Sequence, residues 1–204
     1  MRTVPLDKKT GKMKKIIFSS ILSLLLALHI CAQRGEKITG LYKNKNDFTE
    51  DKLSYPVGCN ETKNSIRVND LFNKPYVIVK YNGNTYSILK KTLYGYNNCK
   101  EERYVFYENK ELLLLNRGEE IAIYKNENTR IREGARINVT NKYFMVDGEN
   151  KIQKLTISNL KNSFPSNKKF QQLVDENFKY NTDLGAYDAT NHIFKINYLL
   201  NESR

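Results

Sequence analysis

The chain has 204 residues, of which 40% are hydrophobic, and a formal net charge of +12, so it can form one domain with an ordinary apolar core. Two histidines and three cysteines supply too few nitrogen and sulfur ligands for zinc, and the G-x-S-x-G, H-E-x-x-H, Walker and C-x-x-C motifs are all absent. The enzyme classes defined by these motifs are therefore excluded. We expect neither a cofactor nor a metal.

Residues 1–32 are predicted to be a secretory signal peptide. Lys14 and Lys15 precede an apolar run over 16–30, which has the length of a secretory h-region and is short for a membrane span. Cleavage after Ala32 would leave Gln33 as the first residue of an exported domain. We expect a periplasmic or extracellular protein with no transmembrane span in its mature chain.

Alternatives stay open for this leader. If it is a lipoprotein signal, Cys31 is the acylated residue, although such signals prefer a smaller residue than Ile30 before the cysteine. An uncleaved membrane anchor is a further alternative. Two starts stay open: residues 1–12 add nothing that a signal peptide needs, which favours Met13, whereas a long n-region is also tolerated, which allows Met1.

Removing the leader lowers the charge and leaves an even number of cysteines. Of 34 Lys and Arg, six precede Gln33, and of 22 Asp and Glu one does, which leaves +7. We interpret this excess as favouring solubility or contact with acidic surfaces. Cys59 and Cys99 remain, and a cysteine pair in an exported chain is more often a disulfide than a metal site or a nucleophile.

The first part of the domain is predicted to be extended chain and turns. Residues 38–42 are expected to form a short strand, 46–51 a polar turn, and 55–59 an extended segment interrupted by Pro56 and Gly58.

Residues 65–124 carry the main strand pattern, with β-branched and aromatic runs separated by turn residues. Asn82-Gly83 between two such runs predicts a type I′ hairpin, because both central positions of that turn need positive φ. Neither face of 76–81 is cleanly polar, which indicates a strand covered on both sides in a barrel or sandwich. Residues 125–136 are charged with few apolar residues, and we interpret them as a mobile loop.

After two further strands that flank Asp147-Gly148, the apolar spacing changes to a helical period. Thr156 is predicted to cap a helix that ends before Pro165. Ser166 is expected to cap a second helix over 167–179, and 191–201 a third, largely buried one. The predicted fold is α+β: an antiparallel β-barrel or sandwich of about seven to nine strands over 33–155, followed by C-terminal helices packed on it over 156–201.

Tyrosine is the compositional feature that stands out, since eight of fourteen tyrosines lie between Tyr76 and Tyr124. They could line a concave sheet and bind a ligand or partner, although cross-strand aromatic packing, which favours these residues in sheets, is the commoner explanation. The candidate ligand-binding residues are Tyr76, Tyr81, Tyr86, Tyr94, Tyr96, Tyr104 and Tyr107.

No catalytic residue is assigned. His192 would need a nucleophile and an orienting carboxylate such as Asp188 to act as a base. The carboxylate pairs Glu101-Glu102 and Glu119-Glu120 leave a glycosidase open, and residues 147–150 carry oxygens that could bind calcium but fit a hairpin turn more simply. Nucleic acid is not expected as a partner of an exported, disulfide-bonded chain.

Several segments resemble uncharacterised secreted proteins of Gram-negative bacteria: Lys52-Leu53-Ser54-Tyr55, Tyr94-Gly95-Tyr96 with Cys99, and Asn159-Leu160-Lys161 with Ser163-Phe164-Pro165. The resemblance implies export and a shared fold, and it contributes no mechanism. We therefore expect a non-catalytic binding or accessory module of the cell envelope, whose partner is a protein, polysaccharide or small ligand. The alternatives are a small envelope hydrolase using carboxylates and an inhibitor or immunity-like protein.

Overall fold

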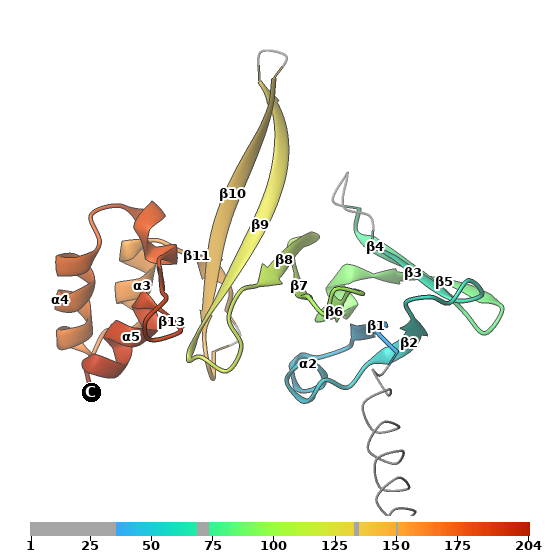
Figure 1. Cartoon of the computed structure of the whole chain (residues 1–204), viewed down its shortest axis with the longest axis horizontal. Coiled ribbons are helices and arrows are strands. Elements are labelled where there is room, and N and C mark those ends of the chain that lie inside the picture. Colours follow the sequence, from blue (N-terminus) through green and yellow to red (C-terminus); the bar gives the residue numbers. More distant parts are fainter. Residues whose placement is uncertain (1–35, 69–73, 133–134, 150) are drawn as a thin grey trace, which may run out of the picture. The chain divides into compact units, whose positions relative to one another are not determined.

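The computed structural model describes residues 36–68, 74–132, 135–149 and 151–204, with the backbone alone for 127–132 and 135–139. Residues Lys37–Arg204 form one compact unit. It is an α+β domain, as predicted, with antiparallel sheets followed by C-terminal helices (Figure 1). The predicted signal peptide, including Cys31 and the cleavage site, lies outside the described residues.

The elements follow one another along the chain as β1 (Ile38–Tyr42), α2 (Lys45–Glu50), β2 (Ser54–Gly58), β3 (Ser65–Val68), β4 (Tyr76–Tyr81), β5 (Asn84–Leu89), the 3₁₀ helix η1 (Lys90–Thr92), β6 (Gly95–Asn97), β7 (Arg103–Tyr107), β8 (Lys110–Leu114), β9 (Ile121–Arg132), β10 (Ala135–Val146), β11 (Gln153–Lys154), α3 (Ile157–Ser163), α4 (Lys168–Asn177), η2 (Asn181–Gly185), β12 (Tyr187–Asp188), β13 (Ile193–Phe194) and α5 (Lys195–Glu202). The described residues thus contain 13 strands, more than expected, and three of them, β11, β12 and β13, are only two residues long.

The strands form one large sheet and two small ones. The large sheet has eight strands in the order β11-β10-β9-β8-β7-β6-β1-β2, and it ends at β11 and β2. The small sheets are β3-β4-β5 and β12-β13. The described residues do not close into a barrel, so the barrel alternative is wrong and the sandwich alternative is consistent with the packing.

Cross-strand partners share a face of a sheet, so the register assigns the two faces of the large one. Leu41 pairs with Tyr96, Tyr96 with Tyr104, Tyr104 with Leu113, and Leu113 with Lys125. By alternation along β9, Ile121 and Ile123 lie on that same face. The small sheet and the C-terminal helices therefore pack on one face at different ends, and α2 packs on the opposite face.

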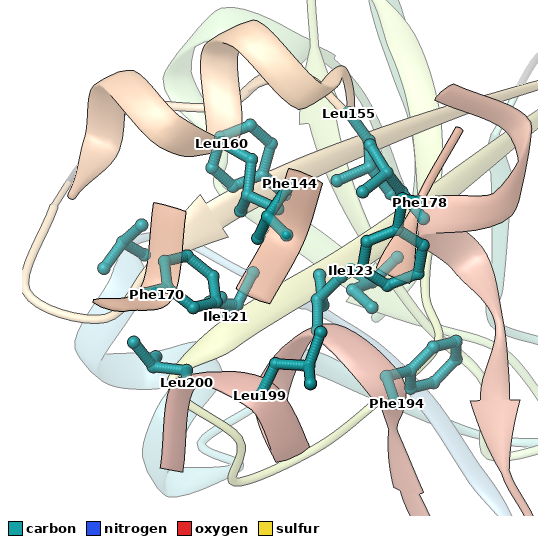
Figure 2. Packing of buried hydrophobic residues seen from close by; sticks show 14 residues of the cluster. Ile121, Ile123, Phe144, Leu155, Leu160, Phe170, Phe178, Phe194, Leu199 and Leu200 are labelled. Carbon is teal, nitrogen blue, oxygen red and sulfur yellow. The ribbon is translucent and has the colours of Figure 1, made fainter. Parts of the chain in front are cut away.

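The helices bury the apolar residues of the β9–β10 end, as Figure 2 shows. Ile121, Ile123 and Phe144 are fully buried against Leu160, Phe170 and other helical side chains. Thr156 caps α3 as predicted, since its hydroxyl accepts from the Asn159 amide at 3.1 Å. Asn167, one residue after the predicted Ser166, caps α4.

The hairpin predicted at Asn82-Gly83 is confirmed. Asn82 has φ 51° and Gly83 φ 79°, and Tyr81 pairs with Asn84 across the two-residue loop. Val77 and Val79 of β4 are fully buried, and they pack with Leu41 and Tyr96 of the large sheet. This contact makes the two sheets a local sandwich.

The prediction of a loop over 125–136 is wrong. Residues 125–132 and 135–136 belong to β9 and β10, which pair from Ile121↔Val146 to Arg132↔Ala135. Over 126–132 of β9 and 135–140 of β10, the described pairing of each strand is only with the other. Backbone pairing between the two neighbouring strands sets the conformation of this segment, whereas composition alone suggested a loop.

Two helix boundaries also differ from expectation. The polar turn expected over 46–51 is the helix α2, capped by Asn44, whose side chain accepts from the Asp47 amide at 2.9 Å. The last helix begins at Lys195 and not at Asn191, because His192 has φ 53° and Ile193–Phe194 pairs with Tyr187–Asp188.

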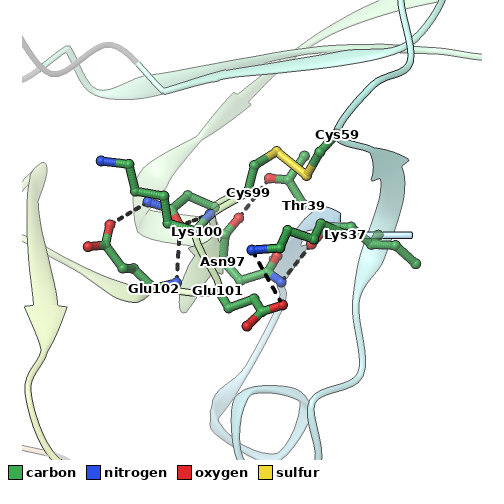
Figure 3. The surroundings of a disulfide bond; sticks show 10 residues. Lys37, Thr39, Cys59, Asn97, Cys99, Lys100, Glu101 and Glu102 are labelled. Carbon is green, nitrogen blue, oxygen red and sulfur yellow. Dashed lines mark hydrogen bonds and ion pairs between the residues drawn. A yellow bond between two sulfur atoms is a disulfide. The ribbon is translucent and has the colours of Figure 1, made fainter. Parts of the chain in front are cut away.

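The predicted disulfide is confirmed (Figure 3). Cys59 and Cys99 have their Cα atoms 5.6 Å apart and are separated by 40 residues. The bond joins the end of β2 to the turn between β6 and β7. Asn97 supports the same junction, since its Nδ2 donates to the Ile38 carbonyl at 2.9 Å and its carbonyl accepts from the Thr39 hydroxyl at 2.7 Å.

Candidate functional site

The seven candidate tyrosines lie on both faces of the structure. Tyr96 and Tyr104 stack with centroids 4.8 Å apart, on the face covered by the small sheet. Tyr94 and Tyr107 lie on the α2 face. The ring centroid of Tyr94 lies 5.1 Å from that of Phe48, and the ring centroid of Tyr107 lies 5.8 Å from that of Tyr143. One continuous surface does not contain them all, and their role as ligand-binding residues stays a prediction.

The remaining three tyrosines belong to the small sheet. Tyr81 and Tyr86 approach the Tyr55 ring at 5.7 and 5.8 Å, and Tyr86 is 39% exposed. Tyr76 is half-buried on the other face of β4. Of these three, Tyr86 therefore offers the largest exposed ring to a partner.

An open groove of about 830 Å³ lies on the α2 face of the large sheet. Only Tyr94 of the seven candidate tyrosines lines it. Its walls come from α2, from the turn between β8 and β9, and from the end of β10. The lining residues include Lys45, Phe48, Thr49, Tyr94, Arg103, Leu114, Asn116, Arg117, Gly118, Glu119, Glu120, Ala122, Tyr124, Met145 and Asp147.

The floor of the groove is aromatic. Phe48 of α2 contacts the Tyr94 ring, and the hydroxyls of Tyr94 and Tyr124 share a hydrogen bond. Burial raises the pKa of both tyrosines, and the neighbouring Tyr94 raises that of Tyr124 further. Both phenols are therefore neutral at physiological pH, and the floor carries no charge of its own.

Arg103 forms the basic wall and ties it to α2. Its side chain is only 7% exposed; Nη1 donates to the Phe48 carbonyl at 2.6 Å, and Nη2 forms an ion pair with Asp51. The guanidinium also lies 5.5 Å from the ring centroids of Tyr42 and Phe48. These contacts fix the guanidinium in one position.

Asp51 is shared among the groups of this wall. Its Oδ1 accepts from the Tyr42 hydroxyl at 2.6 Å, and its Oδ2 lies 3.6 Å from Arg117 Nη2. Burial alone would raise the pKa of Asp51, but the hydrogen bonds from Tyr42 and Arg103 outweigh it, so the pKa lies below its ordinary value. Lys45 extends the wall and donates to the Glu149 carbonyl at 3.2 Å.

Glu119, Glu120 and Asp147 supply the carboxylates of the lining, and we call these three residues the acidic wall. Glu120 forms an ion pair with Arg204. Oε2 of Glu119 is buried and has no hydrogen-bond partner among the described residues. A buried carboxylate oxygen of this kind calls for an explanation, and a donor on a bound ligand would supply one.

Two buried asparagines hold the turn that carries Glu119 and Glu120. Asn116 donates to the Ile121 carbonyl at 2.9 Å and accepts from the Ile123 amide at 2.6 Å. Asn197 of α5 accepts from the Ile121 amide at 2.8 Å and donates to its carbonyl at 2.9 Å. Sequence reasoning missed both residues, because nothing in the local pattern distinguishes a buried asparagine from a surface one.

The other candidate chemistry lies away from the groove lining. His192 is exposed in the turn before β13, and the Asp188 carboxylate accepts from the amides of Thr190 and Asn191. Glu101 pairs with Lys37 at 3.9 Å, and Glu102 accepts from the Asn98 side chain at 2.7 Å (Figure 3). Of the two carboxylate pairs, only Glu119-Glu120 lines the groove, together with Asp147.

Within the described ranges, no group of three or more His, Cys, Asp or Glu side chains could hold a metal ion. None of the helices in the described part of the chain is long and apolar enough to cross a membrane. Comparison with known proteins found no matching family model, no matching curated protein and no matching solved structure.

Proposed function

We propose that this chain is an exported, non-catalytic binding module of the cell envelope, and that its groove holds a segment of a partner protein. The observation that carries the proposal is the composition of the groove, whose lining combines an aromatic floor with both basic and acidic side chains. Export is supported by the Cys59–Cys99 disulfide, by the leader in the sequence and by the resemblance to secreted Gram-negative proteins.

The charges of the lining favour a polypeptide over a polyanion. Lys45, Arg103 and Arg117 balance the three carboxylates of the acidic wall. An anionic polysaccharide would meet repulsion from that wall, whereas a peptide with both acidic and basic side chains can match both sides. The apolar floor offers such a peptide a place for one buried side chain.

Photo-crosslinking from the rim of the groove tests the proposal. A benzoylphenylalanine replaces Thr49, which is exposed and lines the groove, and a matched protein carries it at Thr182, exposed on η2. We expect one defined adduct in the envelope from position 49 and none from position 182. Charge reversal by Glu119→Lys in the same background should remove the adduct.

Adducts of equal yield from both positions, or an adduct that persists with Glu119→Lys, would show that the groove does not select the partner. If the crosslinked partner is an enzyme, assays of its activity with and without the purified protein decide whether the module is an inhibitor. A Kd measured by calorimetry with the identified segment should rise at least about tenfold in the Glu119→Lys protein.

The hydrolase alternative has one specific observation in its favour, namely the three carboxylates that line one groove. It predicts release of soluble fragments from isolated cell-wall material by the wild-type protein and loss of that release in Glu119→Gln. Equal release from wild-type and Glu119→Gln proteins would remove Glu119 from any such role.

A further inference from the structure

The edges of β-sheets expose backbone N–H and C=O groups that can pair with another chain, and proteins protect them with proline, charge or short strands. Most edge strands of this domain have such protection. β2 contains Pro56, and β3 carries the exposed Arg67 at its centre. β11, β12 and β13 are two residues long.

β5 is an edge strand without these protections. Its six residues, Asn84–Leu89, contain no charge and no proline, and five of the six are exposed. Tyr86 and Leu89 are 39% and 43% exposed. Among the described residues, β4 is the one strand that pairs with β5.

The turn determines which backbone groups of β5 point outward. In a two-residue hairpin the closing pair, here Tyr81 and Asn84, is hydrogen-bonded, so Asn84, Tyr86 and Ile88 bond to β4. The N–H and C=O groups of Thr85, Ser87 and Leu89 therefore point away from β4. The Leu89 carbonyl also accepts from the Thr92 hydroxyl at 2.8 Å, which leaves its second lone pair available.

We propose that this outer edge pairs with β5 of a second copy of the chain in a symmetric antiparallel dimer. Outward-pointing residues must pair with outward-pointing residues. The register that uses all three places Ser87 opposite Ser87 of the second copy on the two-fold axis, with Thr85 opposite Leu89. Tyr86 then lies opposite Ile88, an aromatic and β-branched combination that favours cross-strand contact.

A second copy fits this edge because nothing on it repels itself. The nearest strand cation, Lys80 on β4, would lie three inter-strand spacings across and about four residues along the strand from its symmetry mate, roughly 20 Å away. That separation exceeds the Debye length of about 8 Å at physiological salt. Both edges are already extended, so pairing orders little additional backbone, and the two-fold arrangement uses up both free edges and closes the assembly.

The dimer should be weak, because pairing along one six-residue edge buries less surface than the roughly 800 Å² per partner of a standard interface. Sedimentation velocity of the full, oxidised chain at concentrations from about 10 μM to 1 mM should show a monomer–dimer equilibrium. Ser87→Lys and Ser87→Glu should each shift the dissociation constant upward by about tenfold or more, because like charges then face each other on the axis.

An equimolar mixture of the Ser87→Lys and Ser87→Glu proteins should recover dimer, because opposite charges then meet at the axis. Thr140→Lys, an exposed position on β10, is the matched control and should dimerise like the wild type. Thermal unfolding of each variant checks that it is folded.

A wild-type chain that stays monomeric at 1 mM overturns the proposal and leaves the edge to an extended segment of a different protein. A dimer that is insensitive to both Ser87 variants, or a mixture that does not recover, places the interface elsewhere and also overturns it.

Discussion

Replacing Asn197 with leucine should destabilise the domain, because this side chain joins the helices to the large sheet. Asn197 is 2% exposed and makes two hydrogen bonds to the backbone of Ile121, at 2.8 and 2.9 Å. Leucine has a similar size but can make neither bond. The Ile121 carbonyl keeps its bond from Asn116 at 2.9 Å, so the Ile121 amide is the group that loses its partner.

A buried amide without a partner costs about 1–3 kcal/mol. For a loss of about 2 kcal/mol in the free energy of unfolding, the melting temperature of a domain of this size should fall by roughly 4–8 °C. Circular dichroism during heating measures the shift, and hydrogen exchange should show faster exchange at the Ile121 amide.

Asn201→Leu is the matched control, since Asn201 is exposed one turn later on the same helix. It should leave the melting temperature within about 1–2 °C of the wild type, as surface substitutions usually do. If Asn197→Leu were as stable as Asn201→Leu, the two hydrogen bonds would not stabilise the contact between α5 and β9, and the reasoning would be refuted.

Three further predictions follow from single contacts. Reducing the Cys59–Cys99 bond, or replacing both cysteines with serine, should lower the unfolding free energy by at most about 4 kcal/mol, since the closed loop spans 40 residues; urea melts with and without reductant measure this, and coincident curves would contradict it. Lys90→Met should lower the free energy of unfolding by about 3–5 kcal/mol, because Lys90 is 1% exposed and pairs with Glu111 at 2.6 Å. In a double-mutant cycle, the variant that combines Lys90→Met with Glu111→Leu should recover most of this loss. Additive losses would argue against coupling between the two side chains. The pKa of Asp51 is lowered in the folded protein, so its contribution to stability is present above the pKa that this carboxyl has in the unfolded chain and is lost as the pH falls through its folded pKa. Asp51→Asn should therefore weaken the dependence of the melting temperature on acid pH. An unchanged acid dependence would assign it to other groups.

Local patterns were sufficient for much of the fold. The hairpin at Asn82-Gly83 depends on two residues that tolerate positive φ, and the Thr156 cap depends on one hydroxyl next to a helical stripe. Both signals act over a few residues, so they can be read without tertiary contacts. The cysteine pair was predictable because, in a chain predicted to be exported, two remaining cysteines are more often a disulfide than a metal site or a nucleophile.

The groove was not predictable in this way. Arg103 and Asp51 are 52 positions apart in the sequence, and Asn116 and Asn197 are 81 apart, so neither association leaves a local pattern. Tyr94 and the pair Glu119-Glu120 were identified as candidates, but nothing in the sequence indicated that they line the same groove as Asp147. Composition also misled over 125–136, where pairing between two neighbouring strands overrides the low β-propensity of the residues.

The sequence by itself determined that strands precede the C-terminal helices, where the main turn lies and which cysteines pair, because each depends on the backbone preferences or the covalent chemistry of a few residues. Only the tertiary structure decided that the sheet stays open, that the tyrosines divide between its two faces, and that charges from distant segments meet in one groove. These outcomes follow from the register of eight paired strands, since a shift of one residue would move every side chain of a strand to the other face.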